Sequence, residues 1–286
     1  MELGRVGIWS GFFRSRDEAA VRAAAAEVEA LGFGTLWIPG GAGGAIFDSV
    51  ANCLGATRRL VVATGIVNLW MHEPAEVASA HRRLNDQSGG RFVLGLGVSH
   101  RPLVDTRLPG KYRSPLAAMD DYLDALDGAD PPVPSAERVL AALGPKMLER
   151  AAARSAGAHP YLVNPAHTAF ARGVLGPGPL LAPEQKVLLG TDPVDARARA
   201  RDALAPYLRL PNYVGNLRRI GYGDADVSGE GSDRLLDDLV VWGERSVIAD
   251  RVRAHLDAGA DHVCLQVVGT GNEAPLKEWR ELAGLL

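Results

Sequence analysis

Apolar positions along the chain recur in a fixed order: an amphipathic helical segment, a glycine, and then a short apolar run. Apolar residues three or four positions apart predict a first helix over residues 17–31. Ser15 and Glu18 have the spacing of a capping box at its start, and Gly32 stands where a helix commonly ends. The apolar run 35–38 then predicts a buried strand. The same order returns before residues 92–94, 161–163 and 262–268.

Apolar runs of this kind give eight candidate strands. They begin near Val6, Thr35, Leu60, Phe92, Val139, His159, Lys186 and Asp261. Strands that are apolar throughout and alternate with helices indicate a parallel sheet covered by helices. Eight such units favour one closed (β/α)8 TIM barrel over residues 1–286, because a barrel of this kind takes about 250 residues. An open doubly wound sheet is the alternative.

Two stretches interrupt this order. Residues 99–135 carry several prolines after the fourth strand, and residues 207–233 are polar and follow the seventh unit. Long connections in compact domains are either functional lids or mobile segments. Both would project from the C-terminal face of a barrel, where the active sites of such barrels lie. We therefore expect an α/β barrel with insertions after strands 4 and 7.

Composition narrows the function classes. A net charge of −3 argues against a nucleic-acid partner, since nucleic-acid-binding proteins carry basic patches. No apolar run approaches the roughly 20 residues that span a bilayer, and the N-terminus has no apolar signal segment. We expect a cytoplasmic protein without a membrane partner. Cys53 and Cys264 lie far apart in apolar segments, and the histidines lack metal-ligand spacing, so no metal site is expected.

A strand-to-helix turn at residues 139–150 carries the most informative pattern. Gly144 permits close backbone approach, Pro145 suits the first helical turn, and Lys146 adds a positive charge. Free amide groups at a helix start, together with the helix dipole, form an anion site. The sequence therefore predicts a phosphate cradle at this turn, with an ordinary turn and a solvated lysine as the alternative.

Two neighbouring strands deliver further candidates to the same rim. Gly65 interrupts the third strand, which indicates a bulge or a closely approaching ligand, and Asn68 lies near that strand's end. The fourth strand leads to Ser99 and His100, and His100 is a candidate proton donor or ligand contact. The alternatives are that Gly65 only makes room for a neighbouring side chain and that His100 is an ordinary loop histidine.

Familiar catalytic motifs are absent from the sequence. There is no GxSxG nucleophile elbow, no P-loop, no HExxH motif and no obvious carboxylate pair at the rim of the first strands. A phosphate cradle without a nucleophile or metal suggests that a cofactor carries the chemistry.

Five segments, in order, resemble the luciferase-like monooxygenase superfamily, and specifically its coenzyme F420-dependent oxidoreductase branch. They are LGFGTLWI at 31–38, ATGIVN at 63–68, SGGRFVLGLG at 88–97, ALGPKML at 142–148 and AGADHV at 258–263. The resemblance implies a deazaflavin, or a flavin such as FMN, at the mouth of the barrel, and a homodimer packed through helices near the second and third strands. It also implies a non-prolyl cis peptide at Gly65-Ile66 behind the cofactor ring.

The resemblance assigns the cofactor site residue by residue. The backbone of Gly144, Pro145, Lys146 and Met147 would hold the phosphate, and the end of the fourth strand would flank the ring. The full set of implied cofactor-binding residues is Gly65, Ile66, Asn68, Gly97, Ser99, His100, Gly144, Pro145, Lys146, Met147, Pro160, Tyr161, Leu162 and Asn164.

One departure from the branch concerns proton transfer. Better-known F420-dependent dehydrogenases carry an acidic residue or a histidine after the second strand, but residues 38–44 hold no ionisable side chain. His100 is the leading candidate for the catalytic acid or base, ahead of His72. The expected function is hydride transfer between the C5 atom of F420 and a small organic substrate. The alternatives are an FMN-dependent monooxygenase, a non-catalytic flavin or deazaflavin binder, and a lyase or isomerase acting on a phosphorylated substrate.

Overall fold

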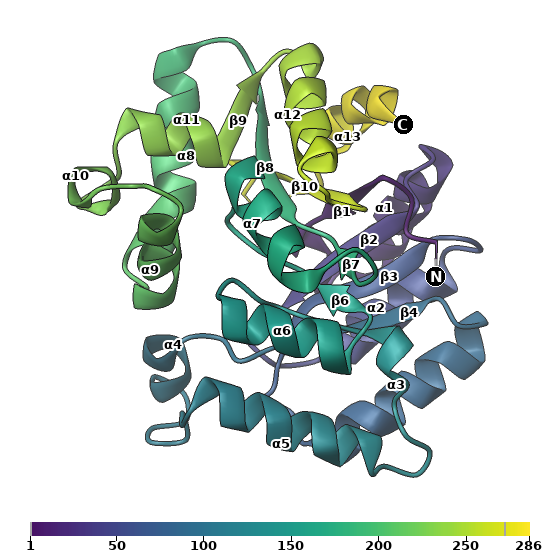
Figure 1. Cartoon of the computed structure of the whole chain (residues 1–286). Coiled ribbons are helices and arrows are strands. Elements are labelled where there is room, and N and C mark those ends of the chain that lie inside the picture. Colours follow the sequence, from purple (N-terminus) through teal and green to yellow (C-terminus); the bar gives the residue numbers. More distant parts are fainter. Residues whose placement is uncertain (1, 272) are drawn as a thin grey trace.

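A curled parallel sheet forms the centre of the computed structural model, which describes residues 2–271 and 273–286 (Figure 1). Within these residues the hydrogen-bonded strand order is β7-β6-β5-β4-β3-β2-β1-β10-β8-β9, and every neighbouring pair is parallel. The strands are β1 (Val6–Trp9), β2 (Thr35–Gly40), β3 (Val61–Asn68), β4 (Phe92–Gly97), β5 (Arg138–Leu140), β6 (Gly157–Ala158), β7 (Leu180–Leu181), β8 (Glu184–Leu189), β9 (Val240–Gly243) and β10 (Val263–Val267).

Residues 180–189, which include β7 and β8, connect distant parts of this sheet. The amide of Ala182 donates to the carbonyl of Ala158 beside β6, at 2.9 Å. On the other side, the amide of Cys264 in β10 donates to the carbonyl of Pro183 at 3.0 Å. The sheet therefore curls back toward itself, and the carboxyl ends of its strands surround one space.

The expected α/β class and parallel sheet are confirmed, but the strand count differs from eight. All eight expected starts lie within two residues of a strand, in β1, β2, β3, β4, β5, β6, β8 and β10. The strand expected at 161–163 is wrong: pairing ends at Ala158, and Leu162 has a φ of 60° that no strand tolerates. The short strand β7 and the strand β9 were not expected from the sequence.

Helices cover the outside of the sheet (Figure 1). They are α1 (Glu18–Ala30), α2 (Ile46–Gly55), α3 (Pro74–Ser88), α4 (Arg101–Asp105), α5 (Pro115–Asp127), α6 (Pro145–Arg154), α7 (Pro165–Leu175), α8 (Pro193–Leu208), α9 (Pro211–Arg219), α10 (Asp224–Val227), α11 (Asp233–Leu239), α12 (Arg245–Asp257) and α13 (Leu276–Leu282). None of the described helices combines the length and apolarity needed to cross a membrane.

The first helix begins one residue later than expected and uses a different cap. The side chain of Asp17 accepts a hydrogen bond from the amide of Ala20 at 3.0 Å. Ser15 instead accepts from the amide of Asp17, so the capping box expected at Ser15 and Glu18 is wrong. An aspartate cap satisfies the same free amide groups, and it places a negative charge at the positive end of the helix.

Both stretches that interrupt the strand–helix order contain helices. Residues 99–135 fold into α4 and α5, and residues 207–233 contain α9 and α10. Helices α8 to α11 pack around a hydrophobic cluster of their own, which includes Leu204, Leu217 and Leu235. The two stretches are therefore ordered walls rather than open loops.

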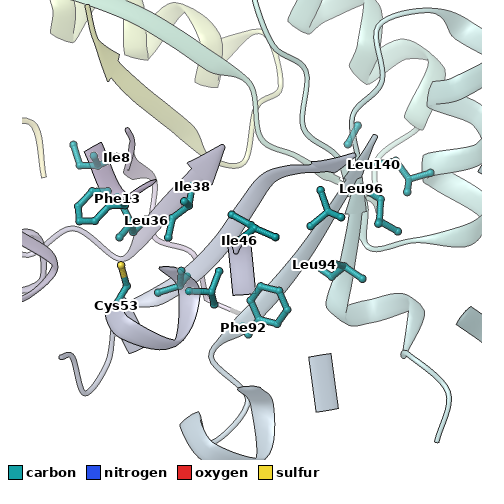
Figure 2. Packing of buried hydrophobic residues seen from close by; sticks show 14 of the residues in the cluster. Ile8, Phe13, Leu36, Ile38, Ile46, Cys53, Phe92, Leu94, Leu96 and Leu140 are labelled. Atoms are coloured by element: carbon teal, nitrogen blue, oxygen red, sulfur yellow. The ribbon is translucent and has the colours of Figure 1, made fainter. Parts of the chain in front are cut away.

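Alternate side chains of the strands face opposite layers. In β2, Leu36 and Ile38 pack outward against the helices, where Figure 2 shows them near Ile8 and Phe13. Trp37 faces the opposite way and joins an interior cluster with Cys264. Both cysteines are buried and unpaired, as expected. Alternate residues of the same strand thus contribute to an outer and an inner core.

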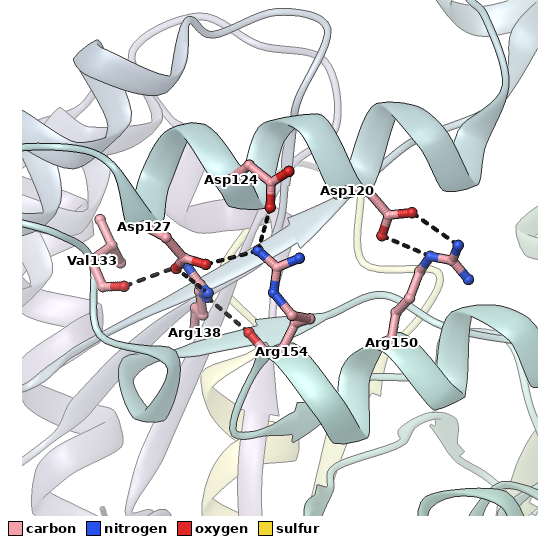
Figure 3. A network of polar contacts seen from close by, with 7 residues as sticks. All are labelled: Asp120, Asp124, Asp127, Val133, Arg138, Arg150 and Arg154. Carbon is pink, nitrogen blue, oxygen red and sulfur yellow. Dashed lines mark hydrogen bonds and ion pairs between the residues drawn. The ribbon is translucent and has the colours of Figure 1, made fainter.

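Ion pairs join α5 to α6 along their length (Figure 3). Arg150 binds both oxygens of Asp120, at 2.8 and 2.9 Å. Arg138 is almost fully buried and donates to Asp127, to the carbonyl of Arg154 and to the carbonyl of Val133. A bidentate pair and a fully satisfied buried guanidinium hold geometry better than single exposed pairs do. This α5–α6 clamp fixes the position of the first turn of α6.

Buried histidines predict that the protein loses stability in acid. Burial lowers the pKa of His159 and His262 to about 4, below the ordinary 6.5. Between pH 6.5 and 4 these two histidines bind more protons in the unfolded chain than in the folded protein. Their burial therefore costs no stability above about pH 6.5, and the free energy of unfolding falls as the pH drops toward 4. Each of these histidines removes on the order of 2 kcal/mol between pH 6.5 and 5. Urea unfolding at pH 7 and pH 5 checks this: an equal free energy of unfolding at both values contradicts it.

Candidate functional site

A cavity of about 790 Å³ lies at the carboxyl ends of the strands. Its floor and sides come from β1 to β6 and the turns that follow them, and α4, α5, α8 and α9 contribute its cover. Residues of both irregular stretches line this cavity. Concave, mainly apolar sites of this size suit cofactors and small molecules.

A bulge in β3 forms one wall of the cavity. Between the pairs Ala63–Val93 and Val67–Leu96, β3 has one residue more than β4. The peptide bond between Gly65 and Ile66 is cis, as the resemblance implied. Extra residues in a strand turn side chains and backbone out of the regular pattern. Gly65 and Ile66 both line the cavity as a result.

The neighbouring strand β4 is shaped to receive this bulge. The hydroxyl of Thr64 accepts from the amide of Gly95 at 2.8 Å and donates to the carbonyl of the same residue at 2.9 Å. A side chain on Gly95 would place its first carbon 1.8 Å from the carbonyl oxygen of Thr64. Gly97 leaves room for the side chain of Ile66. Glycine is therefore required at 95 by close approach of two backbones.

The predicted phosphate cradle stands at the start of α6. Gly144 is the N-cap residue and offers no side chain to its amides. The amides of Met147 and Leu148 both bond to the carbonyl of Gly144 at 3.1 Å, and the amide of Lys146 lacks an acceptor within the helix. Residues 144–147 all line the cavity. The open amide of Lys146 and the positive helix end therefore face the cavity at this turn.

Arg219 adds a second cation beside this turn, and the sequence did not reveal it. It comes from the end of α9, and a side chain on Gly144 would lie 3.8 Å from its guanidinium. Arg219 donates to Asn216 at 2.9 Å. Within the described residues, neither Arg219 nor Lys146 has a carboxylate within 4.0 Å. Two uncompensated cations thus flank the amides of α6.

His100 lies on the cover side of the cavity. Its ring packs 4.7 Å from that of Tyr213, and its Nδ1 atom is buried without a hydrogen-bond partner among the described residues. Burial lowers the pKa of His100 to about 4. The imidazole is therefore neutral at pH 7. It can donate or accept a hydrogen bond, but it does not carry the second proton of an imidazolium. Ser99 beside it has a φ of 52° and also lines the cavity.

A buried ion pair fixes the aromatic wall. Lys186 and Glu184 are both about 1% exposed and lie 2.9 Å apart. Lys186 also donates to the side-chain carbonyl of Gln266 and lies 3.8 Å from the ring centre of Tyr161. The hydroxyl of Tyr161 donates to Gln266 at 2.9 Å and bonds with Tyr207 at 2.8 Å. Both tyrosines line the cavity and are held by this network.

Nine of the fourteen residues expected to bind a cofactor line the cavity. They are Gly65, Ile66, Ser99, His100, Gly144, Pro145, Lys146, Met147 and Tyr161. The other five, together with the runner-up His72, lie outside this lining. Asn68 donates to the carbonyl of Gly41 and accepts from the amide of Trp70, so it organises the turn after β3.

The remaining residues outside the lining support the walls. The carbonyl of Pro160 accepts from the amide of Glu184, and the amide of Leu162 donates to the carboxylate of Glu184. Asn164 caps α7 by accepting from the amide of His167 at 3.0 Å. His72 lies 3.2 Å from Glu76 on α3, away from the cavity.

Other lining residues were not singled out from the sequence. They include Trp9, His159, Tyr207, Tyr213 and Arg219. Trp9 ends an apolar run and His159 begins one, so their pattern is that of core residues. The described residues contain no group of three or more His, Cys, Asp or Glu side chains that could hold a metal ion.

Comparison with known proteins places this geometry in a family. The family model described as luciferase-like monooxygenase matches residues 12–262. A protein of Mycobacterium tuberculosis named as a coenzyme F420-dependent oxidoreductase is 25% identical across the full length of both chains.

Solved structures share the fold at low identity. An F420-dependent secondary alcohol dehydrogenase, in complex with an F420–acetone adduct, has a TM-score of 0.75 at 14% identity over 99% of this chain and 98% of its own. The oxygenating constituent of 3,6-diketocamphane monooxygenase from Pseudomonas putida, in complex with FMN, has a TM-score of 0.71 at 12% identity over 98% and 96%. The family match covers most of the sequence, and the chain belongs to the luciferase-like monooxygenase family.

Proposed function

We propose that this protein is an F420-dependent oxidoreductase, which transfers a hydride between C5 of the deazaflavin and a small organic substrate. The observation that carries the proposal is a cavity with a cationic end at the start of α6 and an otherwise neutral, largely apolar interior. That division suits a ligand with an anionic tail and a planar, uncharged ring system. The full-length similarity to a protein named for F420 supports the choice of cofactor.

The anionic end of the site would be held by backbone and two side chains. The open amide of Lys146, the dipole of α6 and the cations of Lys146 and Arg219 point to one phosphate-sized group. Gly144 leaves the approach to these amides clear because it has no side chain. The α5–α6 clamp keeps the amides in place before any ligand arrives.

The ring end of the site is enclosed and mainly apolar. Ile66 projects from the bulge, and Leu103 and Leu116 line the cavity from the first irregular stretch. Tyr161 and Tyr213 add aromatic surface, and burial raises the pKa of both well above the ordinary value, so both phenols stay neutral. These residues would orient the ring system and exclude water from it.

Bound F420 would supply the hydride carrier, and the protein would supply position and hydrogen bonds. His100 is the side chain proposed for the proton, because its unpartnered Nδ1 is buried in the wall of the cavity. As a neutral imidazole it can accept a proton from a substrate or donate its N–H in a hydrogen bond. We further propose the homodimer that the resemblance implies.

An FMN-dependent monooxygenase is the second candidate function. A cradle for one phosphate suits FMN as well as F420, and the structure solved with FMN has the same fold. A non-catalytic binder is the third candidate. It is favoured by the lack of an ionisable side chain in residues 38–44, beside the cavity wall at Gly41.

Cofactor titration tests the proposal directly. We expect F420 to bind with a dissociation constant on the order of tens of micromolar or below, and more tightly than FMN, as measured by deazaflavin and flavin fluorescence. Tighter binding of FMN would favour the monooxygenase. Binding of neither cofactor would overturn the assignment.

Arg219 offers a sharp test of the cationic end. Arg219→Met should weaken F420 binding roughly fivefold, because one partly solvated cation–phosphate contact is worth about 1 kcal/mol. The matched control is Arg218→Met, since Arg218 is exposed and bonds to Asp224 rather than lining the cavity. Equal affinities for F420 in the two variants would show that Arg219 does not contact the anionic end.

The pH profile of turnover tests His100. Because the pKa of His100 is about 4, the neutral imidazole predominates from pH 6 to pH 8, and we expect kcat to carry no inflection from this group there. The measurement compares the wild type with His100→Asn across that range. An inflection near pH 6.5 that the substitution abolishes would contradict the neutral state of His100.

A further inference from the structure

Three phenols line the cavity, those of Tyr161, Tyr207 and Tyr213. Their rings form one cluster, in which the centre of Tyr213 lies 6.3 Å from that of Tyr161 and 5.4 Å from that of Tyr207. A phenol has a single proton to donate. The hydrogen bonds that each hydroxyl already makes therefore decide what it offers a ligand.

Lys186 fixes the direction of the hydrogen bonds that reach Tyr161 and Tyr207. Its ammonium group can only donate, so the atom of Gln266 that lies 3.1 Å from it is the side-chain oxygen. Tyr161 lies 2.9 Å from the same oxygen and must donate its proton there. In the 2.8 Å contact between the two hydroxyls, Tyr207 is then the donor. The protons of both phenols are committed, and Tyr207 presents only lone pairs to a ligand.

The hydroxyl of Tyr213 is free of such commitments. It makes no hydrogen bond with another described residue, and it is not among the buried polar atoms that lack a partner. The residue is 9% exposed and lines the cavity, so the surface that it exposes belongs to the cavity wall. Burial raises the pKa of Tyr213 well above its ordinary value, so the hydroxyl keeps its proton. Of the three phenols, Tyr213 is the one with a proton left for a ligand.

The position of this donor is fixed by its neighbours. Tyr213 lies in the first turn of α9, where its amide donates to the carbonyl of Leu210 at 3.0 Å. Its ring packs 4.7 Å from that of His100, which follows β4, and meets the ring of Tyr207 edge-on at 89°. A donor that is already held in place needs little reorganisation when a ligand or a transition state forms.

We propose that Tyr213 is a catalytic residue, which donates a hydrogen bond to the acceptor atom of the substrate's reacting group. A hydride added to the carbon of a polarised double bond moves one electron pair onto the partner atom, which water then protonates. The hydrogen bond from Tyr213 stabilises the negative charge on that atom until the proton arrives. The inference rests on the proposed function, because the hydride comes from the carrier named there.

The six tyrosines of the chain make the contact observable. In protein labelled with 3-fluorotyrosine, the ¹⁹F signal of Tyr213 is identified by its loss in Tyr213→Phe. With oxidised F420 at saturation, the probe is 4-methylpyridine N-oxide, whose oxygen accepts and carries negative charge. Its isostere p-xylene has no polar atom. We expect the N-oxide to move the Tyr213 signal further than p-xylene does.

The affinities of the two probes give the second readout. Tyr213→Phe keeps the ring and removes the hydroxyl, so it should weaken binding of the N-oxide about fivefold and leave that of p-xylene unchanged. Tyr207→Phe is the matched comparison, because it removes a hydroxyl of the same wall whose proton is already donated to Tyr161. The N-oxide should keep its wild-type affinity there. If Tyr213→Phe does not fold, its signal is assigned by elimination from Phe variants of the other tyrosines, and the response to the two probes decides.

Equal losses of N-oxide affinity in the two variants, or an equal response of the Tyr213 signal to both probes, would overturn the inference. A Tyr213 signal that F420 shifts and that the N-oxide then leaves unmoved would also overturn it, because the hydroxyl would then contact the cofactor. In both cases bound F420 leaves the proposed function standing. An N-oxide effect in a protein that binds no F420 overturns the proposed function and leaves Tyr213 as a donor to a ligand.

Discussion

The paired hydrogen bonds between Thr64 and Gly95 are the constraint on which the rest of the site depends. A bulge interrupts the ladder between β3 and β4, and backbone groups in a sheet interior need partners. The hydroxyl of Thr64 supplies both, accepting from one group of Gly95 and donating to the other. With the ladder satisfied in this way, Gly65 and Ile66 can leave the sheet and form the wall of a cavity.

Different parts of the cavity behind this wall carry different kinds of chemical group. Charge stands at the start of α6, where Lys146 and Arg219 lie beside the open amide of Lys146. Neutral hydrogen-bonding atoms stand at the floor, where burial keeps His159 uncharged. Between them lie apolar and phenolic side chains held by the buried pair of Lys186 and Glu184. A ligand is therefore oriented by the distribution of its own charge and polarity along its length.

Local signals in the sequence predicted the parts of the site that local structure determines. A glycine and a proline between a strand and a helix marked the turn at 144–147, and Gly65 within a strand marked the bulge. Arg219 could not be found in this way, because its place depends on how α9 packs across the cavity. Trp9 and His159 lie at the ends of apolar runs and resemble core residues. The two-residue strand β6 is too short to produce any periodicity, which explains the wrong strand at 161–163.

The walls of the cavity belong to different hydrophobic clusters. The α5–α6 clamp joins one wall to the main core, whereas α8 to α11 pack on the cluster around Leu204 and Leu235 (Figures 1 and 3). Each wall therefore has a hydrophobic support of its own, and the rings of His100 and Tyr213, whose centres are 4.7 Å apart, make a direct contact between the two walls. Both of these residues line the cavity, so a ligand held there lies against two separately packed parts of the fold at once.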